Sequence, residues 1–245
     1  MLIKSQVKYI QSLSHKKSRD IEDVFIAEGP KLINELLYTP HVQLQQLFGL
    51  REWIAGQPEA TAKKTIEISE RELERISFLQ TPNQVLGIFK KPRFGTGRPV
   101  RNAVSLMLDT IRDPGNLGTI IRCADWFGIA HIFCSPDCAD AFNPKVVQAS
   151  MGSIARVQVH YQPLPAVLQQ YAGVPAYAAM LEGDDVRGLQ PLEQGFIVIG
   201  NESKGISGPV LEACAHRITI ARRGQAESLN AAVAAGIILS HVIRA

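Results

Sequence analysis

The second half of the sequence is dominated by short, nearly continuous runs of valine, isoleucine and leucine. These runs stand between segments with helical periodicity, and they do not alternate with polar residues. Strands buried on both faces of a parallel sheet have this composition, because helices cover the sheet on each side. The pattern predicts an α/β domain built on a parallel sheet, with strands at residues 103–109, 131–135, 156–160, 175–181, 196–200 and 217–221.

The first 90 residues predict a second, smaller α/β unit. Ser69 and Glu72 form a capping box, a pair of side chains that satisfies the free amides at the start of a helix. The remaining pattern places helices at residues 30–38 and 69–79 and strands at residues 24–29, 44–50, 65–69 and 84–89.

The segment Lys90–Arg101 separates the two patterns. It is dense in Lys, Arg, Pro and Gly and lacks hydrophobic periodicity, which is typical of a linker. We therefore predict two domains, residues 1–94 and 95–245. The basic side chains favour a solvated loop, and the alternative is a strand that touches nucleic-acid phosphates.

Composition narrows the class of protein only modestly. In 245 residues, 26 Lys and Arg stand against 23 Asp and Glu, a net charge of +3, so a polyanionic partner is permitted but not required. Because Cys134 and Cys138 lack zinc-knuckle spacing, we expect reduced thiols in a cytoplasmic protein and no metal site. The first 13 residues do not resemble a signal peptide, and the apolar tract 229–243 is too short for a membrane span.

Three glycine-containing turns follow predicted strands. They span Asp113–Gly118, Gly200–Ser207 and Ala221–Asn230, and each has polar residues near a helix start. In open parallel sheets, ligands bind beyond the carboxyl ends of the strands, so three such turns together predict a site. One turn alone could simply connect two elements. Neither a phosphate-binding loop nor a Gly-x-Gly-x-x-Gly motif is present, which argues against nucleoside triphosphate and dinucleotide sites.

The residues in these turns resemble three sequence motifs of the SpoU (TrmH) family of RNA ribose 2′-O-methyltransferases, members of the SPOUT superfamily. The motifs are "NLGTIIR" from Asn116, "IGNESKGIS" from Ile199 and "AESLNAAVAAGI" from Ala226. The stretch "VFIAEGPKLINELL" from Val24 also resembles the small, ribosomal-protein-like RNA substrate-binding domain found in part of that family. The family usually has proline where this chain has Ala221.

The resemblance implies a fold and a cofactor. The carboxyl-terminal parallel-sheet domain would contain a trefoil knot, although chains rarely thread loops. The cofactor would be S-adenosylmethionine, with Gly200, Ile220 and Leu229 lining the adenine slot. No metal is required.

The resemblance also implies roles for five polar residues. Arg122 would lie beside the target ribose. Because a guanidinium is a poor general base, we expect it to orient the 2′-hydroxyl and the adjacent phosphate. Asn116, Glu202, Ser228 and Asn230 would complete the site, although Ser228 and Asn230 also suit simple helix caps.

The residue pattern and the resemblance together predict two partners, RNA and a second copy of the chain. Lys16, Lys17 and Arg19 form a short basic cluster that suits RNA phosphates or a solvated loop. Trp53 and Trp126 are expected in the core. The last helix, predicted from Ser228 to Arg244, is apolar on nearly every side, and the resemblance implies that it pairs two subunits in a homodimer.

The sequence therefore predicts an enzyme that methylates ribose 2′-hydroxyls in structured RNA. Ribosomal RNA is favoured by the additional domain, and transfer RNA is the alternative. Two other functions stay open: an RNA-binding protein of the same fold without turnover, and a methyltransferase that modifies RNA bases.

Overall fold

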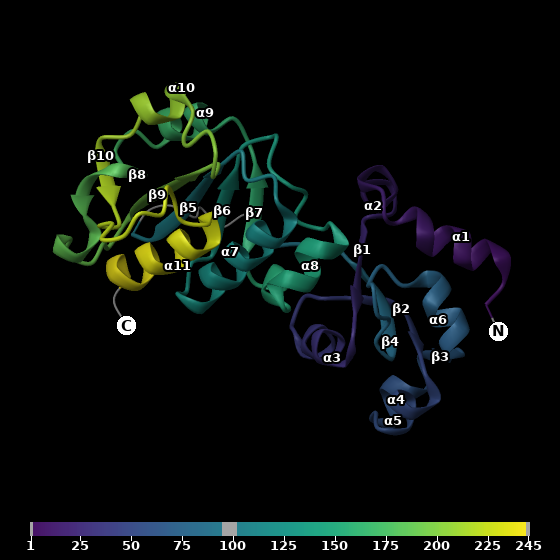
Figure 1. Ribbon diagram of the computed structural model, residues 1–245. Helices are drawn as coiled ribbons and strands as arrows, with labels where there is room; N and C mark the ends of the chain where they lie inside the picture. Colours follow the sequence, from purple (N-terminus) through teal and green to yellow (C-terminus); the bar gives the residue numbers. More distant parts are fainter. Residues whose placement is uncertain (1, 95–101, 244–245) are drawn as a thin grey trace. The chain divides into compact units, whose positions relative to one another are not determined.

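The computed structural model describes residues 2–94 and 102–243, so most of the predicted basic linker lies outside the described residues. The chain forms two compact units, each with its own sheet (Figure 1). The first contains Met1–Phe94 together with Phe142–Ala155, and the second contains Gly95–Ala141 and Arg156–Ala245. The domain boundary at residues 94 and 95 stays a prediction, and the structure adds a later segment to the first unit.

The first unit contains a four-stranded sheet in the order β1-β4-β2-β3. Strand β4 is antiparallel to both neighbours, while β2 and β3 are parallel. The strands are β1 (Val24–Glu28), β2 (Leu44–Gly49), β3 (Thr65–Glu67) and β4 (Val85–Lys90). The helices are α1 (Lys4–Ser12), α2 (Lys16–Glu22), α3 (Pro30–Tyr38), α4 (Arg51–Ala55), α5 (Glu59–Ala62), α6 (Glu70–Ile76) and α8 (Pro144–Ser150), followed by the 3₁₀ turn η1 (Ser153–Ala155).

The predicted capping box is confirmed at the start of α6. Ser69 and Glu72 exchange the two reciprocal hydrogen bonds. The Ser69 amide, the Leu2 amide and the Ser69 hydroxyl donate hydrogen bonds to the Glu72 carboxylate and lower its pKa to about 2. Trp53 is buried, as expected.

Aromatic packing brings the segment Phe142–Ala155 into the first unit. Phe142 lies 5.4 Å from the Phe25 ring of β1, measured between centroids, and the Lys91 ammonium lies 5.2 Å from the Phe142 centroid. Gly152, with a φ of +92°, approaches Glu35 so closely that a Cβ would lie 2.5 Å from its Cγ. Helix α8 therefore belongs to the first unit, although its sequence neighbours belong to the second.

The prediction that Arg19 binds RNA is wrong. Its side chain is only 1% exposed, and the guanidinium donates hydrogen bonds of 2.7 Å to the carbonyl oxygens of Leu13 and Ser14. Arg19 therefore closes the turn between α1 and α2. Lys16 and Lys17 are exposed, and Lys16 pairs with Asp20 at 2.5 Å.

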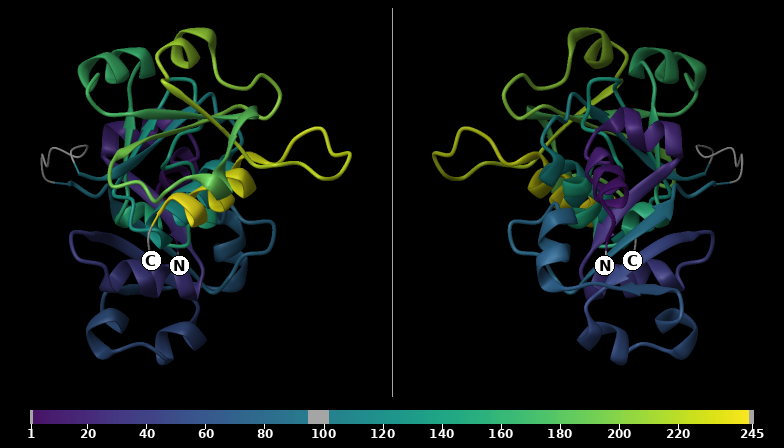
Figure 2. Two further views of the ribbon diagram at one scale, coloured as in Figure 1. Left: turned by 90° about the vertical axis from the view of Figure 1, so that its left-hand side faces the viewer. Right: turned by 90° about the vertical axis from the view of Figure 1, so that its right-hand side faces the viewer.

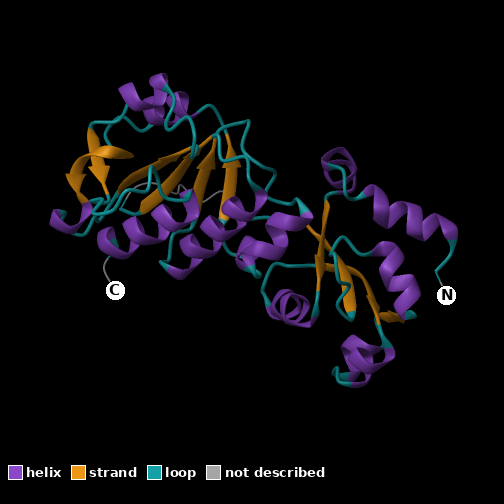
Figure 3. Cartoon of the chain, in the orientation of Figure 1, coloured by secondary structure: helices purple, strands orange, loops and turns teal. Residues whose placement is uncertain are grey.

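The second unit confirms the predicted α/β class. Six parallel strands lie in the order β10-β8-β9-β5-β6-β7, shown in orange in Figure 3. Helices α7 (Pro114–Trp126) and α11 (Ala231–Val242) lie side by side on one face of this sheet, and α9 (Leu164–Gln170) and α10 (Gly208–Glu212) lie on the other (Figure 1). The strands are β5 (Val104–Asp109), β6 (His131–Cys134), β7 (Gln158–Tyr161), β8 (Ala176–Asp185), β9 (Gly195–Gly200) and β10 (His216–Thr219).

The central strands are buried, as their continuous apolar runs predicted. Every residue of β5 and β6 is buried, and so are the first five residues of β9. Trp126 was expected in the core and is instead 84% exposed. The buried face of α7 contains Leu117, Ile121 and Ala124, and Trp126 lies on another side of the helix.

Helix α11 is shorter than predicted, because Asn230 caps it and Ala231 is its first residue. Its buried face includes Ala235, Ile238 and Leu239, and Val233 is 50% exposed. No helix in the described part of the chain is long and apolar enough to span a bilayer.

Candidate active site

The first two predicted turns lie next to each other at the carboxyl edge of the six-stranded sheet. Strands β5 and β9 are paired in register to their last residues, with Asp109 opposite Gly200. The segments that follow these two strands therefore leave the sheet side by side. This edge is where parallel sheets bind ligands.

Asn116 joins side chains from all three turns. Its side-chain nitrogen donates a hydrogen bond to the Glu202 carboxylate, and its side-chain oxygen accepts one of 2.8 Å from the side-chain nitrogen of Asn230. These partners are 86 and 114 residues away in the sequence. The three residues form a polar cluster, here named the Asn116 cluster, that only the folded chain can assemble.

Helix starts hold two members of the cluster in place. Asp113 caps α7, because its carboxylate accepts a hydrogen bond of 2.8 Å from the backbone amide of Asn116. Pro114 follows as the first residue of the helix, a position that suits proline. The side-chain oxygen of Asn230 caps α11 through the amides of Ala232 and Val233. Asn230 therefore caps a helix and also binds Asn116, so the two interpretations of this residue are compatible.

The second turn depends on glycine. Gly205 has a φ of +68°, and its backbone pairs with Asn201 in both directions. A Cβ on Gly200 would lie 2.3 Å from the Gly205 carbonyl carbon and 2.5 Å from the Ile206 nitrogen. The turn folds back so tightly on the end of β9 that only glycine fits at residue 200.

Two structural residues of this site were missed in the sequence. Asp109 accepts hydrogen bonds of 2.7 and 2.6 Å from the amide and hydroxyl of Ser207, which ties β5 to the start of α10. Asn201 accepts from the amides of Ser203 and Lys204 and donates to the Thr110 carbonyl at 3.1 Å. The sequence feature that could have indicated the role of Asp109 was its position at the end of a buried strand.

Arg122 does not contact the Asn116 cluster. It is exposed on α7, on the face that also carries Thr119 and Trp126. Within the described residues it makes no hydrogen bond or ion pair with another side chain. Glu202 was expected to complete the polar site around Arg122, and among the described residues it accepts its hydrogen bond from Asn116.

The third turn is open to solvent. All residues from Ala221 to Asn230 are exposed, and the segment forms the yellow loop that projects from the second unit in Figure 2. Leu229 is 44% exposed and Ile220 is half-buried. Apolar surface is thus available at both ends of this loop, which suits the adenine ring of a nucleoside cofactor. Ser228 makes no hydrogen bond within the described residues.

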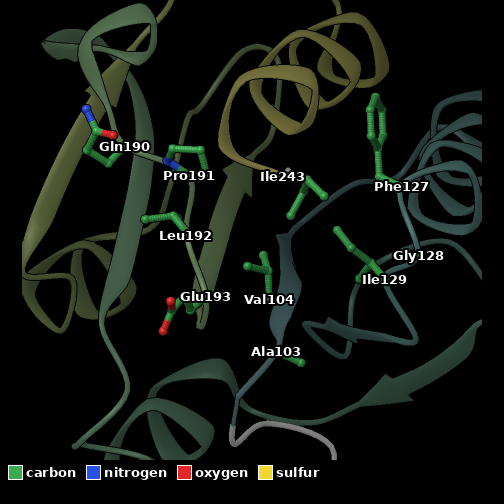
Figure 4. A pocket seen from close by; sticks show the side chains of 10 residues that line it. All are labelled: Ala103, Val104, Phe127, Gly128, Ile129, Gln190, Pro191, Leu192, Glu193 and Ile243. Atoms are coloured by element: carbon green, nitrogen blue, oxygen red, sulfur yellow. The ribbon is translucent and has the colours of Figure 1, made fainter. Parts of the chain in front are cut away.

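A separate cavity lies at the opposite edge of the sheet. It has a volume of about 440 Å³ and is lined by residues that precede or begin β5, β6 and β9, including Val104, Ile129 and Leu192 (Figure 4). Because the Asn116 cluster lies at the carboxyl edge, this cavity is not part of the candidate active site. In the described part of the chain, no three His, Cys, Asp or Glu side chains are arranged to hold a metal ion.

Comparison with known proteins gives two family matches that cover most of the chain. Residues 103–240 match the SpoU rRNA Methylase family, and residues 4–87 match the MRM3-like substrate binding domain. The chain is 31% identical over 242 residues to the Bacillus subtilis 23S rRNA (guanosine(2553)-2′-O)-methyltransferase RlmP, covering 97% of this chain and 95% of the relative.

Two solved structures are similar over almost their whole length. The structure of a protein from Porphyromonas gingivalis, described as a putative RNA methyltransferase of the TrmH family, superposes with a TM-score of 0.84 at 36% identity, covering 99% of this chain and 98% of that one. An AdoMet-bound rRNA methyltransferase from Sinorhizobium meliloti superposes with a TM-score of 0.84 at 30% identity, covering 99% and 95%.

Proposed function

The chain belongs to the SpoU rRNA methylase family, and on that premise we propose that it transfers the methyl group of S-adenosylmethionine to a ribose 2′-hydroxyl of ribosomal RNA. The observation that carries the proposal is the Asn116 cluster, in which Asn116, Glu202 and Asn230 come together from three turns. Ribosomal RNA is favoured over transfer RNA because the Bacillus subtilis and Sinorhizobium meliloti relatives are rRNA methyltransferases and because the first unit matches a substrate-binding domain.

The chemistry needs little from the protein except placement. When bound, the cofactor supplies a methyl group on a positively charged sulfur. The methyl group moves to the 2′-oxygen in an in-line displacement, so most of the acceleration comes from bringing the two reactants together in the right geometry. Gly200, Ile220 and Leu229 would hold the cofactor.

The polar residues would place the ribose. Arg122 offers a planar set of donors for the 2′-hydroxyl and the neighbouring phosphate. A guanidinium is a poor general base, so the hydroxyl proton passes to phosphate or water. The Asn116 cluster fixes the three turns that surround this step.

A cellular experiment tests the proposed substrate. We expect that deleting the gene removes 2′-O-methylation at one ribosomal RNA nucleotide, as mapped in total RNA from the parent and deletion strains. Loss of a transfer RNA methylation instead would show that the substrate class is wrong. Unchanged methylation of all RNA would support the alternative of an RNA-binding protein without turnover.

We also propose that the enzyme works as a homodimer in the cytoplasm, through a knotted second unit. Val233 is 50% exposed and Trp126 is 84% exposed, on two helices that lie side by side. Large exposed apolar side chains on neighbouring helices suit a protein interface. A two-fold dimer would cover Trp126 and Val233 with the same residues of a second copy and would place the Arg122 site beside the other subunit.

Replacing Val233 with glutamate tests the dimer. In a two-fold interface one substitution buries two carboxylates, so we expect a dimer of the native protein and a monomer of the variant at micromolar concentration. Light scattering measures the mass, and a far-UV circular dichroism spectrum that matches the native one shows that the variant is folded. A native monomer would contradict the proposal.

A further inference from the structure

Arg112 lies beside the Asn116 cluster and has no part in the mechanism above. It follows β5 and directly precedes Asp113, the residue that caps α7 and holds the Asn116 amide. The Arg112 side chain is 64% exposed, and its Nη2 lies 3.3 Å from an oxygen of Asp137. The guanidinium is therefore both accessible and next to a carboxylate.

The carboxylate of Asp137 is itself held in place. The Ser135 hydroxyl donates to Asp137 at 2.7 Å. The Ser135 hydroxyl oxygen in turn accepts a hydrogen bond of 2.9 Å from the backbone amide of Thr110. The bond from Ser135 is the main reason that the pKa of Asp137 is lowered, with Arg112 contributing. Asp137 is thus ionised at neutral pH.

The backbone that precedes Arg112 is tied to the same loop. The Ile111 amide donates to the sulfur of Cys138 at 3.3 Å, and the Ile111 carbonyl accepts from the Ala139 amide at 2.8 Å. Cys138 in turn donates to the Leu108 carbonyl at 3.2 Å. The loop after β6 thus fixes the main chain that leads into Arg112 as well as its charged end.

This arrangement leaves most of the Arg112 guanidinium available. Its one hydrogen bond within the described residues is from Nη2 to Asp137. Arg187, another exposed arginine of the second unit, instead binds Asp185 through both Nε and Nη2. Of the two nitrogens through which Arg187 binds its partner, Nε makes no hydrogen bond on Arg112 within the described residues.

The chemistry of this open fork selects its ligand. An exposed ion pair contributes at most about 1 kcal/mol to stability, so the pair of Arg112 with Asp137 adds little to the stability of the fold. A guanidinium held in one orientation matches two oxygens of a phosphate, and phosphates are the anions that an RNA substrate carries. Arg112 lies at the carboxyl edge of the sheet, where the substrate ribose must enter.

We propose that Arg112 is a positioning residue that binds a backbone phosphate of the substrate RNA beside the target ribose, with Asp137 holding its guanidinium in orientation. This inference rests on the proposed function, since it requires an RNA substrate. It adds a second phosphate contact to the one assigned to Arg122.

Substituting Arg112 in the full-length enzyme tests the proposed contact with an RNA phosphate. The substrate is ribosomal RNA extracted from a strain that lacks the gene, and the matched control is Arg187→Ala, which removes the same charge from another Arg–Asp pair. We expect Arg112→Ala to raise KM for this RNA about tenfold and to reduce the slope of log affinity against log salt by about one, as the loss of one phosphate contact requires. Arg187→Ala leaves both values within twofold of native, and neither change alters S-adenosylmethionine affinity.

Two further variants separate charge from orientation. Arg112→Lys keeps the charge and is expected to retain the native salt slope, while its KM lies between those of the native enzyme and Arg112→Ala, because an ammonium lacks the planar fork. Asp137→Asn frees the guanidinium, so RNA affinity stays at least native while kcat falls about threefold, by loss of alignment.

The outcomes are distinguishable. If Arg112→Ala matches Arg187→Ala in KM and salt slope, the phosphate contact is wrong and the proposed function stands. If Arg112→Ala lowers the thermal midpoint or the affinity for S-adenosylmethionine together with the activity, the residue is structural and the inference fails. If the native enzyme methylates no ribosomal RNA, both the inference and the proposed function fail.

Discussion

Replacing Arg122 with alanine is expected to lower the rate of methyl transfer at least about a hundredfold, the size of effect seen when an aligned donor is removed from a reacting oxygen. Arg122→Lys keeps the charge but loses the planar fork, and we expect a loss of at least about tenfold, equivalent to about 1.4 kcal/mol of barrier. S-adenosylmethionine affinity should hardly change. Single-turnover methyl transfer and calorimetric titration of the cofactor measure the two quantities.

The neighbouring position supplies the control for Arg122. Thr119 lies one turn earlier on the same exposed face of α7, and Thr119→Ala should leave the rate near native. Near-native turnover of Arg122→Ala would remove this arginine from the reaction. Because Arg122 is exposed and unbonded within the described chain, neither substitution is expected to affect folding.

The second large effect is expected at Gly200. A Cβ there would lie 2.3 to 2.5 Å from the backbone of Gly205 and Ile206, which cannot move aside as a flexible side chain would. We expect Gly200→Ala to cost about 1–3 kcal/mol of unfolding free energy, as overpacking does, and to weaken cofactor binding at least about tenfold by displacing the turn. Denaturant unfolding and calorimetry measure these changes.

Gly188→Ala is the matched control for Gly200. Its Cβ would meet no atom within 4 Å, and its φ is not positive. Loss of stability without loss of cofactor affinity in Gly200→Ala would place the cofactor away from this turn. Native behaviour of both variants would contradict the geometry of the turn itself.

The fold was predictable where burial controls composition. The runs in β5, β6 and β9 are continuous because both faces of these strands are covered, so the parallel sheet could be predicted from residue types alone. The inclusion of Phe142 and α8 in the first unit could not be, because it depends on long-range packing against Phe25 and Lys91. Helices as short as α4 and α5 also carry too little periodic pattern to be detected.

The candidate site was predictable in part. Polar residues after strands indicated the turns, and the structure brings Asn116, Glu202 and Asn230 together as the motifs implied. Arg19 was misassigned because a charged residue in a basic cluster looks the same in sequence whether it faces solvent or backbone carbonyls. The roles of Asp109 and Asn201 depend on hydrogen bonds between segments about 90 residues apart, which no local pattern reports.

Mass spectrometry of the modified nucleoside tests the central claim most directly. The purified protein is incubated with S-adenosylmethionine bearing a labelled methyl group and with ribosomal RNA from a strain that lacks the gene, and the RNA is then digested to nucleosides. We predict one labelled 2′-O-methylnucleoside, formed by the native enzyme and almost absent with Arg122→Ala. Label on a base, or no label in any RNA, would contradict ribose methylation by this enzyme.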